Sequence, residues 1–179
     1  KPNIRLFVPV PFAANTLVEL NKAQSHYLAN VMRLRANDAV SVFNGTQGEW
    51  LAHVDHAGKK SVTLVLKNEL ARQRFSPDIW LAFAPIKNKT ELVVEKATEL
   101  GVSKLLPVLM KHSVVKSVNM EKLKAHAIEA AEQCERHDIP EIAACQTLQA
   151  LLANWPKDRT LLYGDESGKG EALPALLAH

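Results

Sequence analysis

The sequence predicts an α/β protein in which a small N-terminal β-barrel precedes a domain built on a parallel sheet. Short strand patterns separated by tight turns, with one helix among them, fill the first seventy residues. Between Asp78 and Pro140, strand and helix patterns alternate, which is typical of a parallel sheet. The alternating pattern breaks over residues 68–77, so we expect one domain over residues 1–70 and another over residues 77–179.

Composition and charge restrict the class of protein. Cys134 and Cys145 do not form a CxxC pair, which suits a reducing compartment without a structural zinc or disulfide framework. His53 and His56 would point to opposite faces of a strand, so we expect no metal site. No apolar run is long enough to span a membrane, and Lys1–Arg5 lacks the apolar core of a secretory signal. We expect a cytoplasmic protein without membrane contact.

The expected barrel contains several short strands and one helix. Strand patterns cover residues 4–10, 17–20, 39–43, 49–56 and 61–66, and residues 44–48 form a hairpin turn between the third and the fourth. Asn21 is expected to cap a helix over residues 22–34. In that helix Leu28, Val31 and Met32 should face inward, which leaves His26 and Arg33 near the exposed side.

The second domain is expected to start with a strand, a loop and a helix, and then to repeat this order. Strands are expected at 78–84, 104–109 and 160–164, and helices at 90–100, 120–136 and 147–154. Asn88 with Glu91 has the spacing of a capping box, and Gly101 stands where a left-handed C-terminal cap is needed. Asn119 should cap the long helix, which should bury Met120, Leu123, Ala127, Ala130, Ala131 and Cys134.

Both loops that follow the first two strands of this domain are cationic. Lys87 and Lys89 lie in the first loop, and Lys111, His112 and Lys116 lie in the second. Sites in parallel sheets lie at the carboxyl ends of the strands, so we expect these loops to hold an anionic substrate, with RNA favoured. The alternatives are a metabolic enzyme for a small anion and an ordinary solvated basic surface.

The charge is also uneven along the chain. Residues 1–75 carry a net charge of +5 and the remainder a net charge of −2, within an overall +3. A basic N-terminal half beside a nearly neutral half suggests a polyanion-binding module joined to another domain.

Five features of the second domain stand out together: KNKTE at 87–91, EKATELGV at 95–102, HSVVK at 112–116, EAAEQCER at 129–136, and Pro140. In this order they resemble the RsmE family of bacterial RNA methyltransferases, within the SPOUT (trefoil-knot) superfamily. In the first domain, HYL at 26–28, VMRL at 31–34 and VFNG at 42–45 resemble the family's PUA-like RNA-binding barrel. Two positions differ from the family pattern, because Asn88 replaces a Gly-Asp pair and His112 replaces an arginine.

The resemblance implies S-adenosylmethionine-dependent methylation of N3 of a uridine in 16S ribosomal RNA of the 30S subunit, by a homodimer. The family's knot and cofactor segments would follow His179, so cofactor-binding residues are expected beyond it and the chain as given is expected to lack activity. An RNA-binding module without catalysis is the alternative. By spacing alone, Glu132 and Arg136 form an ordinary surface ion pair.

The resemblance also assigns roles to single residues. Arg136 and Lys87 are expected to stabilise a uracil anion, Gln133 to orient the base and Glu132 to accept a proton. The expected RNA contacts are His26, Arg33, Arg35, Lys87, Lys89, His112 and Lys116.

Overall fold

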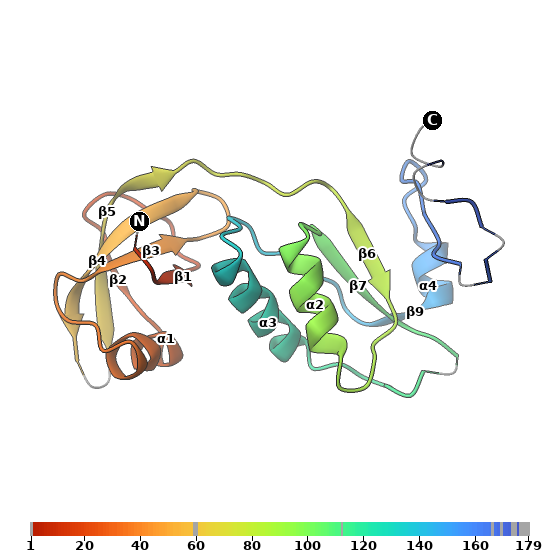
Figure 1. The fold of residues 1–179 in the computed structure, drawn as a ribbon, viewed down its shortest axis with the longest axis horizontal. Helices are drawn as coiled ribbons and strands as arrows, with labels where there is room; N and C mark the ends of the chain where they lie inside the picture. Colours follow the sequence, from red (N-terminus) through yellow and green to blue (C-terminus); the bar gives the residue numbers. More distant parts are fainter. Residues whose placement is uncertain are drawn as a thin grey trace.

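A computed structural model describes residues 2–58, 61–111, 113–165, 167–168, 170–172 and 175. It contains a curled five-stranded sheet at the N-terminal side and a separate parallel sheet that is covered by two helices (Figure 1). The helix α3 (Met120–Gln133) lies between the first sheet and the helix α2 (Thr90–Glu99) (Figure 1). The expected α/β class is confirmed: the first sheet, expected as a small β-barrel, forms a half-barrel, and a parallel sheet follows it.

The first sheet has the strand order β1-β3-β4-β5-β2. Its strands are β1 (Arg5–Phe7), β2 (Leu17–Glu19), β3 (Ala39–Phe43), β4 (Glu49–Ala57) and β5 (Val62–Ala71). β1 runs parallel to β3, and the other pairs are antiparallel. Alternate side chains of these strands fill one core that includes Leu6, Val18, Val40, Val54 and Leu64. The expected hairpin between β3 and β4 is confirmed, and β5 continues five residues further than expected, to Ala71.

The helix of the first domain differs from the expected continuous helix over residues 22–34. The structure has α1 (Lys22–His26) followed by a π-helical turn, η1 (Tyr27–Val31), and Asn21 caps α1 by accepting from Gln24 N–H. The wider turn changes the direction of the following side chains. Leu28 is buried as expected, but the prediction for Val31 and Met32 was wrong, because they are 57% and 40% exposed.

The second sheet is formed by β6 (Trp80–Phe83), β7 (Lys104–Leu109), β8 (Glu141–Ile142) and β9 (Gln146–Thr147), all parallel where they pair. α2 and α3 pack on it through a core that includes Val94, Ala97, Leu105, Leu123 and Ala127. The helix α4 (Leu148–Ala153) follows β9. As expected, Gly101 ends α2 with a positive φ of 85° and the Asn119 side chain caps α3.

Four expectations for the second domain were wrong. Asn88 does not cap α2, because it adopts a φ of +60° and the Thr90 hydroxyl bonds to the Ile86 backbone instead. α3 ends at Gln133 rather than residue 136, and Cys134 is exposed. Residues 160–164 form no strand, because they pair with no neighbouring strand of the sheet. In the described part of the chain, no helix has the length and apolarity needed to cross a membrane.

Candidate nucleic-acid interface

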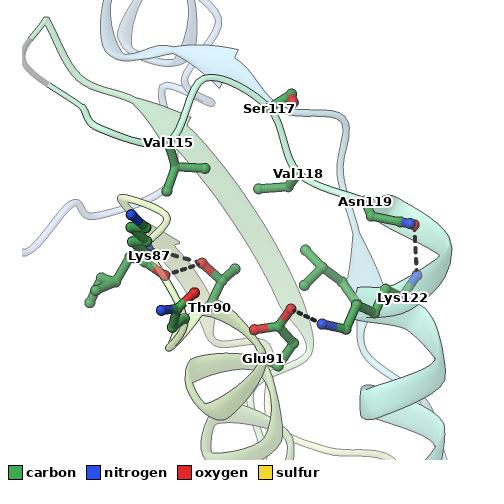
Figure 2. Close-up of a pocket in the computed structure, with 11 residues that line it drawn as sticks. Lys87, Thr90, Glu91, Val115, Ser117, Val118, Asn119 and Lys122 are labelled. Atoms are coloured by element: carbon green, nitrogen blue, oxygen red, sulfur yellow. Dashed lines mark hydrogen bonds and ion pairs between the residues drawn. The ribbon is translucent and has the colours of Figure 1, made fainter.

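The two loops that leave the carboxyl ends of β6 and β7 meet above the first turns of α2 and α3. Because the two strands are parallel neighbours, their following loops emerge at the same edge of the sheet. Between the loops lies a cavity of about 440 Å³ (Figure 2). Its lining includes Lys87, Thr90, Glu91, Val115, Ser117, Val118, Asn119 and Lys122.

The polar side chains of this cavity carry more positive than negative charge. Lys122 Nζ lies 2.6 Å from Glu91 Oε1, and the hydrogen bond from Lys122 is the main reason that the pKa of Glu91 is lowered. Lys87 is exposed and makes no ion pair with any described residue. Thr90 holds the loop from below, because its hydroxyl accepts from Ile86 N–H and donates to Ile86 C=O. Because Lys122 neutralises Glu91, the positive charge of Lys87 remains, and it favours binding of an anion.

A second cavity, of about 470 Å³, lies beside the end of β7. Its lining is mainly apolar, with Lys111 and Lys116 among the residues that contribute, and includes Leu109, Met110, Leu148 and Leu152. Of the remaining expected loop contacts, Lys89 is exposed on the first loop, whereas His112 lies outside the described residues. The structure thus brings Lys87, Lys89 and Lys116 to one edge of the sheet.

The three expected RNA contacts of the barrel are exposed and lie within one segment, residues 26–35. His26 ends α1, and Arg33 and Arg35 follow η1, where all three are exposed. Arg33 adopts a φ of +57°, and the Arg35 N–H donates to Asp38 Oδ2 over 2.7 Å, so the chain turns sharply here. In Figure 1, α3 lies between α1 and α2.

The residues expected to be catalytic lie at the far end of α3. Arg136 Nε donates to Asp138 Oδ1 over 2.8 Å and Nη1 donates to Thr98 C=O over 3.0 Å, leaving 7% of the side chain exposed. α3 has 14 residues, which at about 1.5 Å per residue gives a helix roughly 20 Å long. Lys87 lines the cavity beside the first turn of α3, whereas Arg136 lies beyond its last turn and pairs with Asp138. The expected grouping of Arg136 with Lys87 around one uracil stays a prediction.

Glu132 and Gln133 share that end of α3. Glu132 Oε1 accepts from the Phe7 N–H of the barrel over 2.8 Å, so it does not form the four-residue ion pair with Arg136. Burial raises the pKa of the Glu132 carboxyl, although the Phe7 N–H and the charge of Arg5 oppose this. Gln133 is exposed. The structure brings neither residue to the loops, and their catalytic roles remain untested predictions.

A buried cluster of charges at this junction was missed from the sequence. Arg5 donates to Ala131 C=O and Arg136 C=O, each over 2.7 Å, and its Nε lies 3.3 Å from Glu49 Oε2. His137 Nε2 lies 3.5 Å from the same carboxylate oxygen. Burial lowers the pKa of Arg5 against the opposing charge of Glu49. The sequence does carry one indication of this cluster, namely a single arginine within the apolar strand pattern of residues 4–8.

The contacts of Asp138 predict an acid-sensitive contribution to stability. Burial alone would raise its pKa, but hydrogen bonds from Arg136 and Ser76 outweigh it and lower the pKa. A lowered pKa stabilises the folded state at every pH above the pKa of the unfolded state, which is about 3.9. This stabilisation disappears as the pH falls through the lower pKa of the folded state. We expect Asp138→Asn to lower the free energy of unfolding at pH 7 by about 1.5 kcal/mol. In urea titrations the difference should shrink steadily below about pH 4. A difference that is independent of pH would contradict this assignment.

Comparisons with known proteins agree with this arrangement. A family model described as an RNA methyltransferase domain matches residues 73–178, and one described as an RNA methyltransferase PUA domain matches residues 20–67. The ribosomal RNA small subunit methyltransferase E of Rickettsia conorii is 36% identical over 169 residues, covering 93% of this chain and 68% of the relative. The protein of the same name from Synechocystis is 32% identical, covering 88% of this chain and 52% of the relative.

Solved structures show the same fold. A putative methyltransferase from Legionella pneumophila, solved in complex with the bound cofactor SAM, superposes with a TM-score of 0.75 at 27% identity. The superposition covers 84% of this chain and 66% of that one. The chain therefore spans between about half and two thirds of the length of these three proteins.

Proposed function

Because this chain belongs to the RsmE family of ribosomal RNA methyltransferases, we propose that it serves in the S-adenosylmethionine-dependent methylation of N3 of a uridine in 16S ribosomal RNA. The observation that carries the proposal is the cationic cavity between the two loops, at the edge of the sheet where α/β enzymes place their sites. The ribosomal RNA of the 30S subunit is the proposed partner and the cytoplasm the proposed location.

The chemistry of this reaction explains why a cationic cavity is useful. Uracil N3 becomes a good nucleophile only when it loses its proton, and the resulting negative charge spreads onto the two carbonyl oxygens. Fixed cations near these oxygens stabilise that charge without reorganising during the reaction. Lys87 is the proposed cation that donates hydrogen bonds to these carbonyl oxygens, because it lines the cavity and makes no ion pair with any described residue. Lys89 and Lys116, on the two loops, are proposed to hold neighbouring phosphates.

The described residues do not by themselves fit the methyl donor. S-adenosylmethionine carries a sulfonium cation, which a carboxylate would accommodate. Among the described residues, Glu91 is the only carboxylate that lines the cavity between the loops, and it is already paired with Lys122. The apolar cavity beside β7 has lysines and no carboxylate among its lining residues. We therefore propose that the methyl-donor pocket needs further residues, which the family resemblance places beyond His179.

A direct test is methylation of small ribosomal subunits that lack the modification. Incubation with S-adenosylmethionine should produce N3-methyluridine in 16S ribosomal RNA, which mass spectrometry of nuclease digests detects. The assay needs two protein samples, namely the 179-residue chain and a chimera that continues it with the C-terminal part of the Rickettsia conorii relative. Product from neither sample, while the intact relative is active, would contradict the proposed reaction.

RNA binding without catalysis is the second candidate function. It is favoured because the described residues form cationic surfaces, whereas neither cavity between or beside the loops offers an unpaired carboxylate to the sulfonium of S-adenosylmethionine. It predicts RNA affinity that falls steeply with salt and no binding of S-adenosylmethionine by the 179-residue chain in calorimetry. Donor binding by this chain would favour the first function.

Removing the two lysines of the first loop should weaken RNA binding. We expect the Lys87→Ala, Lys89→Ala double variant to bind single-stranded RNA about tenfold more weakly at moderate salt. The slope of log affinity against log salt should fall by about 0.7 for each lost phosphate contact. The matched control is Lys157→Ala, which removes an exposed lysine after α4 that lines neither cavity. Equal affinities for the double variant and the control would contradict the site.

The proposal includes a homodimer, as the family resemblance implies. Analytical ultracentrifugation of the 179-residue chain and of the chimera measures this state directly. A monomeric chimera at micromolar concentration would contradict this part of the proposal.

A further inference from the structure

The backbone of one residue, Phe7, connects two helices that belong to different domains. Its N–H donates to Glu132 Oε1 of α3 over 2.8 Å, and its C=O accepts from Gln24 Nε2 of α1 over 2.8 Å. We call this pair of hydrogen bonds the Phe7 joint. It links the helix that ends in His26 to the helix whose first turn lines the cavity between the loops.

The Phe7 joint is embedded in buried contacts. The Phe7 ring packs against Phe43, with ring centroids 5.4 Å apart, and the guanidinium of Arg5 lies 3.8 Å from the centroid of the same Phe43 ring. Arg5 also bonds to two carbonyls at the C-terminal end of α3 and faces the buried carboxylate of Glu49. Separating buried charges from their partners is costly, so these contacts favour one arrangement of the barrel against α3.

α3 then sets the distance between the two cationic surfaces. Asn119 and Lys122 at its beginning line the cavity, and Glu132 near its end reaches the barrel. In the view of Figure 1, α1 and the beginnings of α2 and α3 all lie toward the lower side of the molecule. The cavity therefore lies at the beginning of α3, and the barrel is attached near the end of the same helix. The Phe7 joint fixes the spacing between the two.

We propose that the Phe7 joint is a positioning device, which holds the barrel surface of His26, Arg33 and Arg35 at a fixed distance from the cavity so that one RNA strand occupies both. The inference rests on the proposed RNA binding. When the spacing is fixed, an RNA held at one surface experiences a high effective concentration of the other. A loosened joint keeps the contacts of each surface and loses only this gain. Glu132 thus acts as a positioning residue through an acceptor oxygen and needs no proton transfer.

The test compares a short and a long RNA on the whole 179-residue chain. Single-stranded oligonucleotides of about 4 and about 16 nucleotides cover the range of common site sizes, and the longer one is chosen to reach both surfaces. Fluorescence anisotropy gives the ratio of their dissociation constants for the wild-type chain, for Glu132→Ala and for Glu132→Gln. The matched control is Glu129→Ala, which removes the same charge from an exposed position one turn earlier on α3.

We expect Glu132→Ala to reduce the preference for the long RNA about tenfold and to leave the short RNA unaffected. Glu132→Gln should keep the wild-type preference, because its amide oxygen still accepts from the Phe7 N–H, and Glu129→Ala should also keep it. Gln24→Ala, which breaks the other side of the Phe7 joint, should act like Glu132→Ala.

Each result decides between distinct conclusions. If both RNAs bind and all variants share one ratio, the positioning role is wrong and the proposed function stands. Equal loss in the Gln and Ala variants also overturns the positioning role, because the acceptor oxygen would then not suffice. If neither RNA binds the wild-type chain, the proposed function fails and this inference fails with it.

Discussion

Replacing Glu49 with alanine should destabilise the protein more than any surface change, by about 3 kcal/mol. The carboxylate is 1% exposed, accepts from the Ser41 hydroxyl and lies 3.3 Å from Arg5 Nε and 3.5 Å from His137 Nε2. Its removal leaves the guanidinium of Arg5 buried without its counter-charge, which costs more than the net value of the pair itself. Urea unfolding measures the change through the midpoint at constant slope.

Two further variants separate this explanation from a general loss of packing. Asp55→Ala removes a carboxylate from an exposed position on the same strand, β4, and should change the stability by less than about 0.5 kcal/mol. Adding Arg5→Met to Glu49→Ala removes the unpaired cation and should restore part of the loss, so the two changes are not additive. A loss below about 1 kcal/mol for Glu49→Ala alone would show that the cluster tolerates an unpaired charge.

The second large effect is expected at Gly48, the last residue of the hairpin turn before β4. Gly48 has a φ of +71°, and an added Cβ would meet the backbone of Ala71 and lie 2.8 Å from Gln73 N. Backbone atoms cannot move away as a flexible side chain can, and the positive φ adds strain of its own. We expect Gly48→Ala to cost about 3 kcal/mol, measured as a shift of the urea midpoint.

Gly45 provides the matched control within the same turn. Its φ is +90°, but an added Cβ would meet only Phe7 Cε2, at 3.9 Å, which is an ordinary contact. Gly45→Ala should therefore cost only the backbone strain, about 1 kcal/mol. Equal losses at the two positions would mean that the close approach of Gly48 to residues 71–73 has no energetic weight. Since the Gly48 N–H also donates to Gln73 Oε1, this approach fixes the segment that leaves the barrel.

Elements with strong local signals could be predicted from the sequence. β3 and β7 have the expected bounds, Asn21 and Asn119 cap their helices, and Gly101 ends α2 as expected. These features depend on neighbouring residues alone, namely alternating burial, a side-chain acceptor before a helix, or a glycine with positive φ. Local patterns were not sufficient where strand formation depends on a distant pairing partner. Residues 160–164 have the apolar pattern of a strand but form none in the sheet.

The candidate site shows the same division. The loops of Lys87 and Lys116 meet because consecutive parallel strands end at one edge, a rule that can be applied to a sequence. The positions of Glu132 and Arg136 could not be obtained in this way. Their spacing permits an ion pair between them, but Phe7 and Asp138 are better placed partners, and both lie outside the helix.

The sequence alone determined the family, the order of most helices and strands, and the cationic character of the loops, because motifs, hydrophobic periodicity and charge are local properties of the chain. Only the tertiary structure decided how the barrel joins α3 through Arg5, Glu49 and the Phe7 joint. Contacts between residues more than a hundred positions apart depend on how two domains fit together, and no local pattern encodes that fit. The burial of Arg136 also depends on a contact outside its own segment, because Nη1 donates to Thr98 C=O, 38 positions earlier in the chain.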